Sequence, residues 1–443
     1  MKNLKFISLI LMIFFVASCT KDLIDAPAPS SNDDALLKSS SPKVKIAVLT
    51  DIHCLIPSLM PNDYRTNSYF QASVSRDRKL IELSFPIFMK AVSELIEEKP
   101  DVLLITGDIP RAGEKIGHET VAGILQQIEN EGTKVYVIPG NNDILSSDAL
   151  NFKNEPPTPV ANVTQTEYTE IYANFGYNEA LYRDVNSLSY ICQPCDNLWI
   201  LGIDACKYTL TSGKYKVSAV LNPATLAWIE EKMEEAREND ITVLAMMHYD
   251  ILEHYTGQGG LEAGIIKDNI LNANALMKAG INLIFTGHLH ANDIVQYTNE
   301  GKMLTEIETG GLVTPMCPYR VMTLDDNYLK IQTNRITSID AELPGGIDFL
   351  TYSDSIFTSR LNSMFTYYMQ VLFGRTKEQA EALAPYWARA FQAYFAGDEK
   401  LWPAERKSLK ILAETTPSVI MNYLNSVWND LPPKDNNIHI KLK

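Results

Sequence analysis

The sequence predicts an α/β fold in which a second sheet faces the first and a helical region follows. Apolar runs of strand length alternate with apolar residues at helical spacing, and two successive βα units between residues 101 and 138 predict a largely parallel sheet. Short alternating runs follow residue 290, and residues 353–428 are helical in pattern and rich in aromatics. Five apolar runs end directly in metal-binding residue types, which indicates a functional site where strands end.

The stretch DVLLITGD, residues 101–108, is the clearest of these five runs. Its apolar and β-branched residues, bounded by Pro100 and Gly107, predict a strand that is buried on both faces. Asp108 then places a carboxylate at the C-terminal end of the strand, where open α/β sheets bind their ligands. The other four runs end in Asp51 and His53, in Asn141 to Asp143, in His248, and in His288 and His290.

The first half of the fold is expected to begin at Lys43, where KVKIAVLT predicts a strand. A loop from Cys54 to about residue 78 should follow it, in which Tyr64, Arg65 and Arg76 are either substrate contacts or ordinary solvated side chains. The pattern then predicts a helix at 79–99, a strand at 101–106, a helix near 115–131 and a strand at 133–138.

The second half begins with two runs, SLSYICQP and LWILGIDAC, that predict paired strands. A helix at 222–239 is expected to start at Asn222-Pro223, a capping residue followed by the proline favoured in a first turn. The antiparallel runs near the end are expected to complete a sheet of the second half. Further elements are predicted at 241–247, 268–279, 281–286, 293–298, 302–308, 319–324 and 328–334, with an edge strand at 437–443.

The N-terminal residues have the features of a targeting segment. Lysines precede an apolar run that is too short to span a bilayer, which predicts a signal peptide over residues 1–18. Val16-Ala17-Ser18-Cys19 resembles a bacterial lipobox, so Cys19 is expected to carry lipid and to anchor the chain to a membrane of the cell envelope, periplasmic or on the surface. Plain secretion with an incidental cysteine is the alternative. Residues 19–42 lack periodicity and should form a flexible tether.

Charge and cysteine content narrow the possible partners. The formal charge is −15, and cleavage before Cys19 removes two lysines and no acids, which gives −17. An acidic surface repels phosphate backbones, so a nucleic-acid partner is not expected.

Cys192 and Cys195 could form a small disulfide or remain two thiols, and both interpretations stay open. The oligomeric state is not predicted.

The residue types at the strand ends suit the hydrolysis of phosphate esters. Two metal ions about 3.5–4 Å apart can hold the ester oxygens and acidify a water molecule. Such a site needs carboxylates, neutral imidazoles and one carboxylate shared by both ions. Mixed nitrogen and oxygen ligands suit Mn, Fe or Zn, and the residue types do not choose among these divalent or trivalent ions.

The ordered motifs at Asp51-Ile52-His53, Gly107-Asp108, Gly140 to Asp143, His248 and Gly287 to His290 resemble those of the calcineurin-like metallophosphoesterase family. The resemblance covers residues 43–340 and implies a four-layer αββα sandwich of two facing mixed sheets. Residues 341–443 lie outside it, and their helical, aromatic-rich pattern predicts a C-terminal helical subdomain with a terminal strand. The resemblance also implies a small phosphorylated substrate and attack by a metal-bridging hydroxide. By position, Asp51, His53 and His290 would hold the first metal, Asn141, His248 and His288 the second, and Asp108 both.

One position departs from the family pattern. Asn142 stands where the family has the histidine that protonates the leaving oxygen, and a carboxamide cannot release a proton. Asp108 and Asn142 are nevertheless the residues to which we assign roles in the reaction. The substrate could have an acidic leaving group, as a phosphoanhydride has, or His254, Tyr249 or a metal-bound water could donate the proton. If no group donates the proton, the chain would be a non-catalytic, metal-dependent receptor of phosphate ligands. Among enzymes, the alternative to a small-molecule phosphoesterase is a nuclease.

Overall fold

The computed structural model describes residues 43–442 except 212–213, 261–263, 327 and 398. The predicted signal peptide at 1–18, the lipidation at Cys19 and the tether at 19–42 lie outside the described residues. Within the described part of the chain, no helix is both long enough and apolar enough to cross a membrane.

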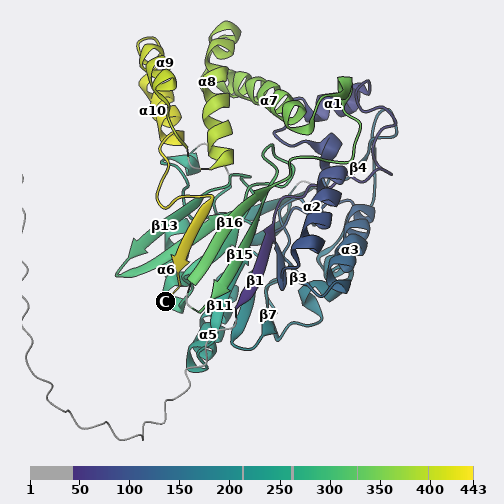
Figure 1. The fold of residues 1–443 in the computed structure, drawn as a ribbon, viewed down its shortest axis with the longest axis vertical. Coiled ribbons are helices and arrows are strands. Elements are labelled where there is room, and N and C mark those ends of the chain that lie inside the picture. The colour runs from purple at the N-terminus through teal and green to yellow at the C-terminus, as the bar shows by residue number, and fades with distance from the viewer. Residues whose placement is uncertain (1–42, 212–213, 261–263, 327, 398, 443) are drawn as a thin grey trace, which may run out of the picture. The chain divides into compact units, whose positions relative to one another are not determined.

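The first sheet has six strands in the order β17-β16-β15-β1-β2-β3 (Figure 1). Strands β1, β2 and β3 are parallel, as the βα units predict, and β15 to β17 continue the sheet in antiparallel pairs on the other side of β1. Its strands are β1 (Val44–Leu49), β2 (Val102–Ile105), β3 (Lys134–Val137), β15 (Pro318–Asp325), β16 (Tyr328–Arg335) and β17 (Asn437–Lys441).

The assignment of β15 and β16 to the sheet of the second half was therefore wrong. Both crossovers of the first half lead to the same side of β1, so the backbone groups on its other edge need a partner. Strand β15 supplies it, with Val48 opposite Arg320 in the register.

The second sheet has seven strands in the order β13-β14-β12-β11-β8-β7-β6. Strands β14, β12, β11 and β8 are parallel, and antiparallel strands continue the sheet at both edges. Its strands are β6 (Tyr182–Arg183), β7 (Tyr190–Cys195), β8 (Leu198–Ile203), β11 (Thr242–Met247), β12 (Leu283–Thr286), β13 (Ile294–Asn299) and β14 (Lys302–Glu308).

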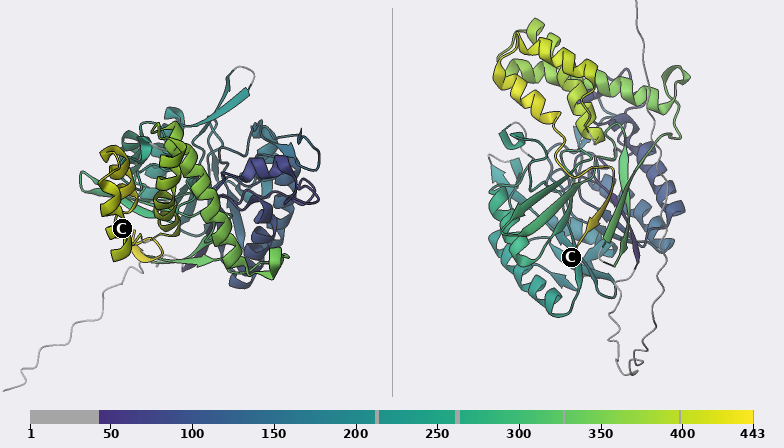
Figure 2. Two further views of the ribbon diagram at one scale, coloured as in Figure 1. Left: turned by 90° about the horizontal axis from the view of Figure 1, so that it is seen from above. Right: turned by 60° about the vertical axis from the view of Figure 1, so that its left-hand side comes forward.

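The two sheets face each other across a common core. Ile46 and Val48 of the first sheet and Ile200 and Phe285 of the second belong to one buried apolar cluster. Helices cover the outer faces, so the layers are α, β, β and α, which confirms the fold that the resemblance implied (Figures 1 and 2). Helices α2 (Ser84–Glu98) and α3 (Lys115–Asn130) cover the first sheet, and α5 (Pro223–Glu238) and α6 (Asn269–Ala279) the second.

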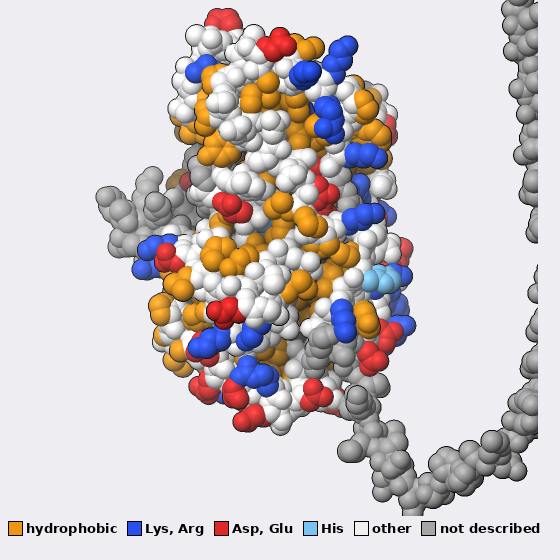
Figure 3. Space-filling model, turned by 90° about the vertical axis from the view of Figure 1, so that its left-hand side faces the viewer, with side chains coloured by type: hydrophobic (Ala, Val, Ile, Leu, Met, Phe, Trp, Pro, Cys, Tyr) orange, Lys and Arg blue, Asp and Glu red, His pale blue; other side chains and the backbone are white. Residues whose placement is uncertain are grey.

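The C-terminal helices form a region with its own apolar core. Trp387 and Phe391 stack at its centre, with ring centroids 6.1 Å apart. Buried Arg360 joins this region to the segment before α2 through Glu82, at 2.9 Å, and the carbonyl of Lys79, at 2.8 Å. Hydrophobic side chains also reach its outer surface (Figure 3). The helices are α7 (Phe349–Val371), α8 (Lys377–Ala396), α9 (Pro403–Ala413) and α10 (Ser418–Val427).

Several short elements were not predicted. Helix α1 (Ser68–Val74) lies in the expected loop after the first strand, where the Asn67 side chain caps it by accepting from Phe70 N–H. Strands β9 (Cys206–Thr211) and β10 (Lys214–Ala219) form a separate hairpin. The remaining short elements are β4 (Leu150–Asn151), β5 (Thr158–Pro159), α4 (Gln165–Ile171), a π-helical turn at Ala173–Tyr177 and 3-10 turns at Ile81–Leu83, Gln258–Gly260 and Pro344–Gly346.

Candidate metal centre

Strand ends from both sheets deliver the predicted site residues to one place. Asp51 and His53 follow β1, Asp108 follows β2, and Asn141 and Asn142 follow β3. From the second sheet, His248 follows β11, and His288 and His290 follow β12. Two close groups of ligand atoms result, one formed by Asp51, His53 and His290 and one by Asp108, His248 and His288.

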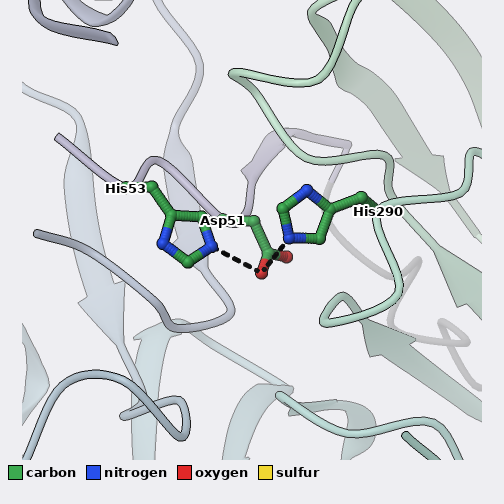
Figure 4. Close-up of side chains that lie close together, drawn as sticks. All are labelled: Asp51, His53 and His290. Carbon is green, nitrogen blue, oxygen red and sulfur yellow. Dashed lines mark ion pairs between the residues drawn. The ribbon is translucent and has the colours of Figure 1, made fainter. Parts of the chain in front are cut away.

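The first group is centred on one carboxylate oxygen. Asp51 Oδ1 lies 3.2 Å from His290 Nε2 and 3.6 Å from His53 Nε2 (Figure 4). The other oxygen, Oδ2, accepts hydrogen bonds from the Thr50 hydroxyl at 2.7 Å and from His288 N–H at 2.8 Å. The carboxylate is thereby oriented so that Oδ1 points at the two imidazoles.

The second group contains the carboxylate that lies between both groups. Asp108 Oδ2 is 3.5 Å from His53 Nε2 and 3.6 Å from His248 Nε2. The predicted ligand Asn141 also joins this group, because its Oδ1 lies 3.0 Å from His248 Nε2. One oxygen of Asp108 therefore faces a histidine of each group.

Hydrogen bonds to the backbone orient two of the imidazoles. His248 Nδ1 lies 2.8 Å from the carbonyl of Thr106, and His53 Nδ1 lies 3.2 Å from that of Arg111. A carbonyl only accepts, so each Nδ1 carries the proton, and in the neutral ring Nε2 presents a lone pair to the carboxylates. Asp51 Oδ1 and His53 Nε2 are buried without a hydrogen bond. Lone pairs that converge without a proton between them fit a metal cation.

The electrostatics give both carboxylates and two of the imidazoles the protonation states that metal ligands need. Burial raises the pKa of both carboxyl groups, but the facing imidazoles outweigh it, so the pKa of Asp51 falls well below its usual value and that of Asp108 also falls. Burial lowers the pKa of His288 and of His290 to about 3. At neutral pH these carboxylates are ionised and these imidazoles are neutral. His248 differs, because burial lowers its pKa but the facing Asp108 and Asp51 carboxylates outweigh this and raise it.

The backbone is unusual at this site. Asp51, His53, Asp108, His288 and His290 all have positive φ angles, between 38° and 72°. Such conformations cost free energy in residues other than glycine and are concentrated at functional sites. Close packing also requires glycine at two positions, because a Cβ atom at Gly140 would overlap the Asp108 carboxylate and one at Gly287 would overlap Thr50.

Asp143 and His118, which were not assigned a role in the site, stabilise the turn at residues 140–143. The Asp143 carboxylate accepts hydrogen bonds from the N–H groups of Asp108, Ile109 and Gly140 at 2.7–2.8 Å. Buried His118 then donates from Nε2 to the Asp143 carbonyl at 2.9 Å. His118 therefore stabilises this turn. Its role could not be predicted from the sequence, because it depends on a contact that forms only in the folded chain.

The two residues considered as alternative proton donors lie in different surroundings. Tyr249 packs against His288, with ring centroids 4.6 Å apart, and burial raises the pKa of its hydroxyl. His254 instead is buried among carboxylates, and its two ring nitrogens face Asp293 and Glu306. The geometry therefore does not support His254 as a donor to a leaving group.

An arginine beside the site was also missed. Arg78 donates to the His288 carbonyl at 3.3 Å, whereas Arg76 is exposed and stacks on Tyr367 at 4.4 Å. Arg65 likewise stacks on Tyr64, at 5.3 Å, and Tyr64 packs against Phe70. Arg78 is the last residue of the loop that was predicted after β1, and this position was the feature of the sequence that could have indicated it.

A mostly apolar cavity of about 490 Å³ lies beside His288. Arg78 and His288 form its polar part, and aromatic side chains that also belong to the core of the C-terminal helices form its apolar part. The aromatics of this region therefore pack a core and also line a cavity. Its apolar lining includes Met369, Leu372, Trp387 and Phe391.

The described cysteines are free thiols. Cys192 and Cys195 are not bonded to each other, and Cys192 lies 3.3 Å from the carbonyl of Gly176. The disulfide left open by the sequence is absent from the described residues.

The chain is similar to a known protein family and to proteins of known structure. The family model described as calcineurin-like phosphoesterase matches residues 44–292. A dimetal phosphatase from Danio rerio is similar in structure, with 11% identity, a TM-score of 0.45, and coverage of 66% of this chain and 96% of that one. A purple acid phosphatase from yellow lupin (Lupinus luteus) has 11% identity, a TM-score of 0.43, and coverage of 67% and 52%.

A search of curated proteins gives no match. The family model alone covers more than half of the chain and includes the residues of both groups of ligand atoms. The chain therefore belongs to the calcineurin-like phosphoesterase family, whose members are phosphoric ester hydrolases.

Proposed function

We propose that the chain hydrolyses phosphoester or phosphoanhydride bonds with two metal ions held by these groups. Asp51, His53 and His290 would hold the first ion, and Asn141, His248 and His288 the second. The observation that carries the proposal is the position of Asp108 Oδ2, which faces His53 and His248 at nearly equal distances. When bound, such a pair of ions polarises the phosphoryl oxygens and lowers the pKa of a water molecule.

The residues of the chain would bind and orient the substrate. Arg78 brings a positive charge next to His288, where it can attract the phosphate group. The Asn142 carboxamide already donates to Asp108 at 2.5 Å, so its role is to position this carboxylate rather than to move a proton. Without a general acid at this position, esters with acidic leaving groups should react fastest.

The cavity beside His288 supports a substrate whose alcohol part is apolar. Its apolar side chains lie next to Arg78, so a phosphate near the metal centre could place an alkyl or aryl group among Met369, Trp387 and Phe391. Burial of such a group contributes about 0.8 kcal/mol per CH₂. We therefore propose phosphoesters that carry an apolar ester group as the substrate class, with cleavage fastest where the leaving group is acidic.

We also propose that the protein is anchored in the cell envelope through lipid on Cys19. The proposal is supported by the charged and apolar residues before this cysteine. A cysteine to serine change at position 19 should move the protein from the membrane fraction to the soluble fraction of cells. Retention in the membrane fraction would contradict the lipid anchor.

The function is tested with the purified full chain loaded with Mn²⁺, Fe²⁺ or Zn²⁺. We expect metal-dependent hydrolysis of 4-nitrophenyl phosphodiesters or monoesters, which a chelator abolishes and added metal restores. Binding of phosphate esters without turnover would overturn the proposal in favour of a receptor. Preferential cleavage of single- or double-stranded DNA would identify a nuclease.

A further inference from the structure

A further group of ionisable side chains, separate from the two groups of the candidate metal centre, is buried on the outer side of the seven-stranded sheet. Glu306 and Glu308 alternate along β14 with Ile307, which faces the core between the sheets. Their carboxylates therefore point to the opposite face, as Leu304 does. Asp250 and His254, in the segment after β11, lie over these carboxylates. Asp293, the residue before β13, is the fifth member of the group. Each of the five residues is at most 3% exposed.

The charges of this group are not balanced by the protein. Four carboxylates face a single histidine, and no lysine or arginine among the described residues pairs with them. His254 Nδ1 lies 3.5 Å from Asp293 Oδ2 and 3.8 Å from Glu308 Oε2, and Nε2 lies 3.9 Å from Glu306 Oε1. Uncompensated buried carboxylates are costly, so the group requires a cation or protons.

The free atoms of the group point toward one another. Both oxygens of Asp250 and both ring nitrogens of His254 are buried without a hydrogen bond. Glu306 is oriented by the N–H groups of Ile251 and Leu252, at 2.7–3.2 Å, and keeps lone pairs for a further partner. One ligand atom from each of Asp250, His254 and Glu306 lies within 4.8 Å of the others, which is close enough for the three residues to hold one metal ion.

We propose that Asp250, His254 and Glu306 bind a further divalent cation, separate from the family's metal centre. Oxygen donors with one imidazole suit Mn²⁺. His254 would bind through Nε2, while Asp293 and Glu308 orient the ring from the Nδ1 side, as carboxylates orient metal-bound histidines. The proposal uses none of the residues that hold the proposed catalytic metals.

The site would brace the segment that follows His248. His254 N–H donates to Gln258 Oε1 at 2.6 Å, and Gln258 Nε2 donates to the Tyr394 hydroxyl of α8 at 3.0 Å. A cation bound by His254 and by Glu306 of β14 would thus link the sheet to the C-terminal helices. It would be structural, because its residues are buried and the apolar cavity does not include them.

The test counts bound metal in the full chain after treatment with a chelator, reloading with MnCl₂ alone and desalting. A His53→Ala, His248→Ala double variant removes ligands of the proposed catalytic metals, so a failure of that proposal does not affect the count. We expect it to retain one Mn²⁺ per chain and to lose it when Asp250→Asn is added. Asp184→Asn is the matched control, because Asp184 is also buried but is hydrogen bonded to Thr225 and Ser187.

A crystal of the wild-type chain soaked in MnCl₂ gives a second readout that needs no variant. We expect an anomalous peak between Asp250, His254 and Glu306. Its absence, with the ring nitrogens in contact with carboxylates, would show that protons balance the group and would overturn the proposal. Retention of the Mn²⁺ ion in the Asp250→Asn variant would overturn it as well.

Discussion

Asn142 holds both carboxylate oxygens of Asp108. Its backbone N–H donates to Oδ1 at 2.8 Å, and its carboxamide donates to Oδ2 at 2.5 Å. Oδ2 is the atom that faces both groups of imidazoles, so Asn142, which we expect to stand where the family has a histidine, contacts the centre of the site directly. The contact explains how an asparagine can be useful here without donating a proton.

Asn142→His should restore general-acid help to a substrate with a basic leaving group. We expect kcat for an alkyl phosphodiester to rise about 10²-fold, at the low end of the range for general-acid catalysis. The 4-nitrophenyl diester is the control and should change little, because its leaving group needs no proton. Unchanged turnover of the alkyl ester, with metal still bound, would contradict the assignment of position 142.

Asp108→Ala should remove the carboxylate that the two proposed metals share. Removing a residue that only hydrogen bonds to a metal ligand lowers metal affinity or activity about 10–100-fold. Asp108 is a proposed ligand itself, so we expect kcat/KM to fall by at least about 10²-fold and bound metal to decrease. Metal content and the rate for 4-nitrophenyl diester measure these effects. Asp184→Ala is the control, because Asp184 is also a buried acid but belongs to neither group of ligand atoms. An unchanged rate in Asp108→Ala would show that the bridging assignment is wrong.

Leu372→Asn should weaken the binding of substrates with long apolar groups. Leu372 is 56% exposed and lines the cavity, so a polar side chain is tolerated by the fold but makes the cavity less apolar. We expect KM for a hexyl ester to rise severalfold and that for a methyl ester to stay the same. Leu350→Asn is the matched control, since Leu350 is 49% exposed on α7 and does not line the cavity. Equal effects on both esters would argue against the proposed substrate class.

His118 should make folding stability depend on pH. Burial lowers its pKa from 6.5 to about 4, so as the pH falls below 6.5 the unfolded chain takes up a proton that the folded chain does not. The stability is full above pH 6.5 and decreases toward pH 4, by about 3 kcal/mol in total. Urea unfolding at pH 7.5 and 5.0 measures the difference.

The His118→Gln variant isolates this effect from that of other histidines. It should be less stable than the wild type at pH 7.5, because the bonds to Tyr172 and to the Asp143 carbonyl are disturbed. Its stability should nevertheless decrease less between pH 7.5 and 5.0. Equal pH dependence in both proteins would show that His118 is not held neutral.

Much of the fold was predictable from local patterns. Buried parallel strands are short apolar runs, and the ligand residues follow them directly, so the order and type of the central elements could be predicted from 101–108 and its counterparts. The pairing of β15 with β1 could not, because strand pairing depends on which edge remains open after the first three strands have assembled.

The same division applies to the site. The sequence by itself determined which imidazoles and carboxylates follow the strands, and the family resemblance supplied their expected roles. Only the tertiary structure decided that Asn142 holds Asp108, that Arg78 lies beside His288, and that His254 faces carboxylates. Residue type and spacing record what a side chain can do, but its partners come from distant segments that only folding brings within hydrogen-bond distance.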